Sequence, residues 1–422
     1  MGHSQKPYLK EFRVDLLCEI NDNDEATKEL SVLLDFYFKR HEQIPFLRAV
    51  KKHFKLRAGL TPWEWLNIAS VFLQFGEQKS AKIWLSREPY NPLDIPLKLS
   101  LQAEFEKNKG DIDQARELIE QAIKKCSENQ VNKQMSEQDR QKAEKDYLEY
   151  RHDRARLLQF QERKYSEAVG EYREIINVIE NKIPQDTFRH LLAVAYKNLG
   201  ECVLSLGNKD QEERWREAES HFQTALEHEK SIRLYSHLTP EIHYQLAKLA
   251  EKMSQHNKVR RELDDCISSA EESRHGLVAT IAKNKLLWID VKEKDLYWND
   301  IAERWDLLAD SLRARLGHSW AARTLINSNV NAARILMKEK QYGIAKEHLQ
   351  ENLNIFRANV NLRRQGDLDR IAMTLAGLHL ISDSQQDGKD YWVLLNSEFA
   401  DAGKHISALD VNSPEKIWKR RL

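Results

Sequence analysis

The most constraining feature of this sequence is an interval of 34 residues at which small side chains return. The pairs are Ala69 and Ala103, Gly76 and Gly110, and Ala81 and Ala115. A period of this length is typical of a two-helix unit that cannot bury its apolar face alone and must stack on neighbouring units. The period therefore predicts a helical array rather than a single globular core.

The composition agrees with an all-helical array. The chain has 14 glycines and 9 prolines in 422 residues, and 31% of its residues are charged. Few helix breakers and many charges are typical of long amphipathic helices with solvated outer faces. The chain is longer than one ordinary core requires, but an array of stacked units has no such limit.

Apolar and small residues around the repeats resemble the tetratricopeptide repeat (TPR) pattern. The matching positions are Trp65, Ile68, Ala69, Phe72, Ala81 and Leu85 in a first copy, Leu99, Ala103, Ala115, Ile119 and Ala122 in a second, and Tyr196, Leu199, Gly200, Val203, Ala218, Phe222 and Ala225 in the clearest copy. The resemblance reaches from about Trp65 to about Asn359. It implies an all-α fold, a right-handed α-solenoid of stacked helix–turn–helix repeats with helical caps at both ends.

Along the chain, the pattern predicts six parts that differ in how well they match the repeat. These are an N-terminal helical cap (1–60), two TPR-like repeats (61–126), a polar helix extension or linker (127–150), further TPR-like repeats (151–270), degenerate repeats (271–360), and a C-terminal helical cap with a basic tail (361–422). The stretch from Pro89 to Pro96 interrupts the helical pattern, because proline cannot sit in a helix interior.

Charge and cysteine usage restrict the class of protein. Lys plus Arg and Asp plus Glu both number 66, whereas a protein that coats nucleic acid usually carries a basic excess. The four cysteines are far apart and form no C-x-x-C pair, which is typical of reduced thiols in the cytoplasm. No apolar run is long enough to span a membrane, so we expect no membrane association.

The sequence offers no catalytic motif, and we expect no enzyme activity and no cofactor. Phosphate-binding glycine loops, the H-E-x-x-H zinc motif and the G-x-S-x-G nucleophile motif are missing from it. The nearest approach to a metal-binding set is a histidine-rich stretch: His221, His228, Glu229, His237 and His243. Its spacing fits metal ligation poorly, so we predict a charged helix end without a metal.

With no catalytic or metal-binding motif in the sequence, the remaining hypothesis is a surface that recognises a partner. In proteins that this chain resembles, the first helices of successive repeats line a concave groove that holds a peptide or a partner helix. Mapped by the repeat pattern, the groove would present Lys197, Asn198, Glu201, Tyr244, Gln245, Lys248, Asn327, Asn331, Arg334 and Lys338. Amide side chains can pair with a peptide backbone and a cation can hold a carboxylate.

Three functions are compatible with such a surface. The first is a non-enzymatic scaffold or adaptor that binds a partner protein or peptide, within a multi-subunit complex. The second is a sensor or regulatory subunit of a larger complex that responds to a peptide or small ligand. The third is a helical-repeat RNA-binding protein; it ranks last, because Lys197, Tyr244 and Asn331 do not recur at matched positions in each unit.

Overall fold

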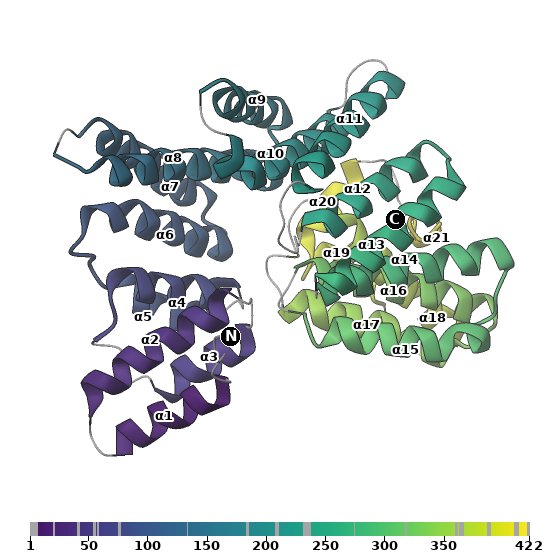
Figure 1. Cartoon of the computed structure of the whole chain (residues 1–422). Coiled ribbons are helices and arrows are strands. Elements are labelled where there is room, and N and C mark those ends of the chain that lie inside the picture. The colour runs from purple at the N-terminus through teal and green to yellow at the C-terminus, as the bar shows by residue number, and fades with distance from the viewer. Residues whose placement is uncertain are drawn as a thin grey trace. The chain divides into compact units, whose positions relative to one another are not determined.

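The computed structural model describes most of the chain, with short gaps (Figure 1). The described residues are 7–19, 22–39, 43–53, 56, 59–74, 77–132, 134–182, 185–206, 211–230, 238–273, 275–316, 319–358, 362, 367–385, 390–408 and 413–419. Contacts divide the chain into two compact units, Met1–Ile175 and Ile176–Leu422. Every regular element that the structure describes is helical, which confirms the all-α prediction.

Unit 1 is built from short helices that lead into longer helical pairs. Its elements are α1 (Pro7–Glu19), α2 (Asn23–Lys39), α3 (Gln43–Lys52), α4 (Pro62–Gln74), α5 (Gln78–Leu85), a 3-10 turn η2 (Pro92–Asp94), α6 (Ile95–Lys109), α7 (Ile112–Val131), α8 (Glu137–Leu157) and a π-helical turn η3 (Leu158–Glu162). Helix α9 (Tyr165–Lys182) crosses the boundary between the units. The predicted polar segment is divided between the end of α7 and the start of α8, which pack against each other.

Unit 2 continues with long helical pairs and ends in short helices. Its elements are α10 (Gln185–Ser205), α11 (Gln211–Lys230), α12 (Leu238–Lys252), α13 (His256–Glu272), α14 (Gly276–Lys294), α15 (Trp298–Arg313), α16 (Ser319–Lys338), α17 (Tyr342–Ala358), α18 (Leu368–Gln385), α19 (Val393–Asn396), α20 (Ala400–Ala408) and α21 (Pro414–Trp418). From α10 to α20 each helix packs on the next one in the chain, and α20 and α21 both pack on α18. This is the TPR-like α-solenoid that the repeat pattern predicts.

Small residues lie where paired helices cross. Ala218 is fully buried, and a Cβ atom added to Gly200 would lie only 2.8 Å from Cε1 of Phe222. The missing side chain at Gly200 therefore lets α10 approach α11, and the large ring of Phe222 fills the space beside the contact. This packing explains why the clearest sequence copy alternates small and large residues.

The recurring glycine marks a turn between paired helices. Gly110 ends α6 in the left-handed conformation, at φ 101°, and its N–H donates to the carbonyl of Glu106 at 3.0 Å. A residue with a Cβ adopts this conformation at a cost, so glycine is favoured here. Asp111 follows and caps α7 through the backbone N–H of Gln114 at 3.1 Å. The earlier copy of this glycine, Gly76, lies outside the described residues.

Within unit 2, the first helices of successive pairs form a row. Helix α12 contacts α10 and α14, and α16 contacts α14 and α18, whereas the second helices α11, α13, α15 and α17 make no comparable contacts with one another in the described part of the chain. The pairs are therefore closer together on the side of the first helices. No helix among the described residues combines the length and the apolar character needed to cross a membrane.

Candidate functional site

All ten residues of the predicted groove lie on first helices of unit 2. Helix α10 carries Lys197, Asn198 and Glu201, helix α12 carries Tyr244, Gln245 and Lys248, and helix α16 carries Asn327, Asn331, Arg334 and Lys338. The repeat pattern thus assigned them to the correct class of helix. Their side chains, however, differ in whether they already form hydrogen bonds or ion pairs with other residues of the chain.

The residues of α10 bind other parts of the chain. The ammonium of Lys197 lies 2.8 Å from the Glu241 carboxylate on α12 and 3.6 Å from Glu201. Lys197 and Asn198 are both buried, with exposed fractions of 8% and 2%. This part of the predicted groove is an internal link between α10 and α12, because one cation is already shared by two carboxylates.

Helix α12 presents a lysine without a carboxylate partner. Lys248 is exposed, and its only hydrogen bond within the described structure is to the Gln245 side chain, at 3.1 Å. Surrounding protein atoms lower the pKa of Lys248 by desolvation; Glu201 opposes this effect, and Lys252, Lys285 and Lys197 reinforce it. A cation surrounded mainly by other cations has unused capacity for a negatively charged or carbonyl group.

An aromatic pair lies beside this lysine on the same row of helices. The rings of Tyr244 on α12 and Trp320 on α16 are 6.2 Å apart and tilted by 52°. The Tyr244 hydroxyl makes no hydrogen bond to another described residue, and burial raises its pKa. The pair therefore offers apolar ring surface together with an unused hydroxyl.

Some of the predicted groove residues on α16 bind other residues of the chain, and one does not. Asn327 accepts a hydrogen bond from Arg370 Nε at 2.8 Å, and Lys338 lies 3.2 Å from Asp295. Arg334 donates to the carbonyl oxygen of Trp418 at 2.7 Å, and its guanidinium lies 5.3 Å from the centre of the Trp418 ring. Asn331 makes no hydrogen bond to another described residue.

The end of the row beyond α16 contains a buried charge cluster that sequence reasoning missed. Asp367 is fully buried and accepts hydrogen bonds from Arg323 Nη2 at 2.9 Å and from Arg370 Nη1 at 2.9 Å. Desolvation lowers the pKa of Arg370 despite the charge of Asp367. No local pattern would reveal this cluster, because Arg323 and Asp367 are 44 positions apart.

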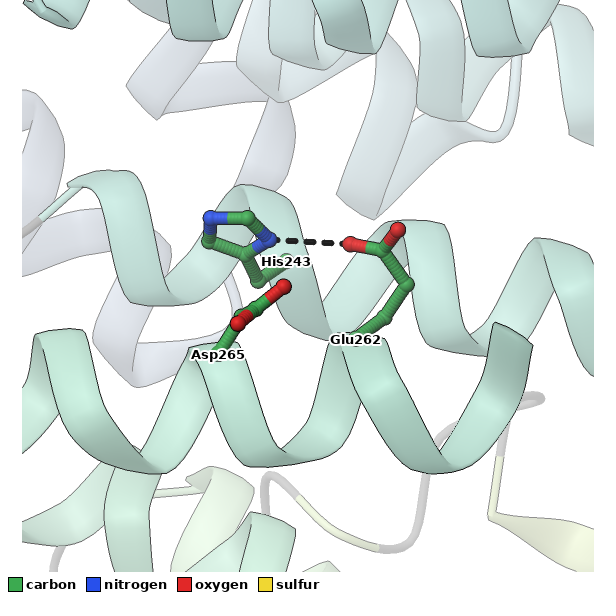
Figure 2. Close-up of side chains that lie close together, drawn as sticks. All are labelled: His243, Glu262 and Asp265. Carbon is green, nitrogen blue, oxygen red and sulfur yellow. Dashed lines mark hydrogen bonds and ion pairs between the residues drawn. The ribbon is translucent and has the colours of Figure 1, made fainter. Parts of the chain in front are cut away.

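A second group on α12 and α13 has the composition of a metal site (Figure 2). His243, Glu262 and Asp265 bring one potential ligand atom each within 4.8 Å of one another. His243 Nδ1, however, lies 2.9 Å from Glu262 Oε2, and the other oxygen of Glu262 lies 3.4 Å from Arg261. Although burial opposes it, these contacts lower the pKa of Glu262. The geometry is that of a hydrogen-bonded pair between two helices.

The histidine-rich stretch does not assemble into one centre. His221 and His228 both lie against the ring of Tyr196, at centroid distances of 5.9 and 5.7 Å. Glu229 instead lies 3.0 Å from His190, and His243 pairs on the next helix as described above. His237 lies outside the described residues.

Comparison with known proteins concerns the fold alone. No protein-family model and no curated protein matches the chain. Similar solved structures include a Rap protein complexed with competence and sporulation factor, at 16% identity, 84% coverage of this chain, 98% of that chain and a TM-score of 0.48. Yeast Tom70 has 11% identity, 96% coverage of both chains and a TM-score of 0.41. A signal-transduction ATPase with a tetratricopeptide repeat sensor from Pyrococcus horikoshii has 13% identity, 97% coverage of this chain, 54% of that chain and a TM-score of 0.44.

Proposed function

We propose that unit 2 is a non-enzymatic scaffold or adaptor that binds a partner protein or peptide on the concave side of α10, α12, α14 and α16. One observation carries this proposal. Tyr244, Lys248 and Asn331 keep unused hydrogen-bonding groups on the row of first helices, whereas Lys197 and Arg334 beside them are engaged within the chain. Unused polar groups on a concave face are what a ligand needs for orientation.

The chemistry of the three side chains suits an extended peptide. The Asn331 amide has both a donor and an acceptor, which match the two groups of a peptide unit. Lys248 has two further donors for carbonyl or carboxylate oxygens, and Tyr244 and Trp320 offer ring surface to an apolar side chain. In this arrangement the backbone and one side chain of the ligand are recognised together.

The proposal extends to the setting of the protein. An adaptor of this kind acts by joining partners, and we place it in the cytoplasm as one subunit of a larger complex. Three of its four free cysteines, Cys126, Cys202 and Cys266, are buried and serve packing, which is consistent with a reducing compartment.

Affinity purification from native cell lysate tests the proposal, with the full chain as bait and with and without nuclease. The double variant Lys248→Met and Asn331→Ala removes the unused groups, and we expect it to lose a stoichiometric partner that the parent chain retains. Lys258→Met is the matched control, because Lys258 lies on the second helix α13 and pairs with Glu219 of the second helix α11, away from the row of first helices. Equal recovery by the double variant would remove this face from the site, and loss of the partner on nuclease treatment would favour RNA.

A further inference from the structure

Unit 1 contains a different surface, formed where α6 and α8 lie against the same helix. Leu99 of α6 and Tyr150 of α8 pack in one cluster with Cys126 of α7. The Ser100 hydroxyl on α6 lies 3.5 Å from Asp153 Oδ2 on α8. We call the strip between these two helices the α6–α8 seam, and its carboxylates are Asp94, Asp146 and Asp153.

One end of the seam holds two carboxylates without partners. Asp94 directly precedes α6 and is 6% exposed, yet its side chain neither caps the helix nor forms an ion pair with a described residue. Asp146 on α8 likewise has no hydrogen bond or ion pair in the described structure. Burial raises the pKa of both groups, and the charge of Asp94 raises that of Asp146 further. Neither carboxylate therefore forms an ion pair with a described cation, and nearby lysine charges offset their burial only in part.

The other end of the seam repeats this imbalance. Burial raises the pKa of Asp153 to about 6, and Glu104 and Glu149 contribute in the same direction, against Arg156 and Lys107. Arg156 is a loose partner, with Nη1 at 3.8 Å from Asp153 Oδ1. Negative charge thus continues along the seam instead of ending at Asp146.

We infer that the α6–α8 seam binds a basic peptide segment of a partner, with one Lys or Arg side chain between Asp94 and Asp146 and another beside Asp153. An ammonium or guanidinium group would supply charge-assisted hydrogen bonds to Asp94 and Asp146, which form none with described residues, and would add a cation to Asp153 beside the loosely placed Arg156. This surface is separate from the concave face of unit 2, and the inference does not depend on the function proposed for that face.

The spacing of the seam favours an organic cation over a metal ion. Within the described part of the chain, only His243, Glu262 and Asp265 bring three ligand atoms within 4.8 Å. Metal ions bind their oxygen ligands at about 2.0–2.6 Å, so seam carboxylates spread more widely do not form such a shell. A Lys or Arg side chain reaches across the wider space because its donors lie on a long stem.

Lys142 of the chain itself lies close enough to act as a cation for these carboxylates. It is exposed, lies one helical turn before Asp146, and its charge lowers the pKa of both Asp94 and Asp146. Its ammonium makes no ion pair with a described residue. In the proposed complex the partner's cation lies between Asp94 and Asp146, with which Lys142 forms no ion pair.

Fluorescence anisotropy with a fluorescein-labelled penta-arginine peptide tests the inference on the full chain. We expect the seam variant Asp94→Asn with Asp146→Asn to bind about tenfold more weakly than the parent chain, since two charge-assisted contacts are lost. The matched control is Glu120→Gln with Glu144→Gln, which removes the same charge from exposed positions of α7 and α8. The control should bind within about twofold of the parent chain.

The outcomes are distinct. Equal weakening in the seam and control variants would show attraction to net charge alone and overturn the inference, as would unchanged binding in the seam variant. Lys142→Met adds a second measurement. Tighter peptide binding in this variant supports a seam that lacks its cation, whereas unchanged binding with a lower melting temperature would make Lys142 the seam's own counterion and overturn it. Circular dichroism of each variant verifies that the helices are retained.

Discussion

The two units of the chain carry the same kind of helical packing but differ in which charged side chains lack an ion pair. In unit 1, Asp94, Asp146 and Asp153 are carboxylates whose pKa values burial raises. In unit 2, desolvation by surrounding protein atoms lowers the pKa of the cation Lys248. Asp94 and Asp146 in one unit and Lys248 in the other form no ion pair with a described residue.

The comparison teaches that packing and surface charge vary independently in this fold. Ala115 in unit 1 and Ala218 in unit 2 are both fully buried at the crossings of paired helices. The side chains that face away from those crossings are not constrained by packing, so carboxylates without an ion pair occur at one place and a cation without one at another. The balance of acidic and basic residues holds within each unit as well as in the whole chain, so this difference is local to these sites.

The largest expected effect tests whether the packing is shared. Ala115→Phe and Ala218→Phe each insert a ring at a crossing without free space, and each should destabilise its unit by about 1–3 kcal/mol. Urea unfolding followed by circular dichroism measures both, with the exposed Glu120→Gln as control. A midpoint that moves for only one of the two alanines would break the comparison, because the packing would then differ between the units.

A somewhat smaller effect concerns Trp418 of α21, whose ring covers the cation Arg334 within unit 2. The ring of Trp418 lies on Gly377, where an added Cβ would be 2.6 Å from it, and also faces Arg334. Because this ring is partly exposed, Trp418→Ala should cost about 1–2 kcal/mol. Hydrogen exchange of α18 and α21 measures the loss.

Trp418→Phe is the control for that experiment, since it keeps a ring over Arg334 and should lose less protection. Unchanged exchange in Trp418→Ala would show that α21 does not cover Arg334 in solution. The contact between Arg334 and Trp418 would then play no part in the stability of unit 2.

The sequence predicts the packing better than the sites for a physical reason. The 34-residue interval, Gly110 and Ala218 report contacts within a helical pair, and such contacts leave a local pattern. The engagement of Arg334 by Trp418 spans 84 positions, and that of Lys197 by Glu241 spans 44. No periodicity encodes which of the groove residues a distant segment already occupies.

The carboxylates of the α6–α8 seam show the same limit of sequence analysis, because segments far apart in the chain bring them together. In the sequence, Asp94 belongs to a proline-rich interruption and Asp146 to a polar segment that reads as solvated helix. Only the packing of α6 and α8 on α7 brings them to one strip. The missing counter-charge is a property of the folded chain, so composition alone could not have predicted a cation site there.

The smallest expected effect, Asp153→Asn, sharpens the comparison through its pH dependence. The pKa of Asp153 rises from 3.8 to about 6 on folding. Well below pH 3.8 the carboxyl group is protonated in the folded and unfolded states alike, so it makes no difference to stability. Between pH 3.8 and about 6 the unfolded chain ionises while the folded state does not, so stability falls across this interval and the loss is complete above about pH 6.

Asp153→Asn removes the ionisation, so the variant should be more stable than the parent chain at about pH 7.5, and most of this gain should be absent at about pH 4. The side chain is 38% exposed, and solvent reduces the gain to the order of 1 kcal/mol. Urea midpoints at both pH values measure the difference, and Glu144→Gln controls for loss of charge on α8. A gain of the same size at both pH values would mean that the amide packs better rather than that the charge is uncompensated, and unit 1 would then lose its acidic counterpart to Lys248.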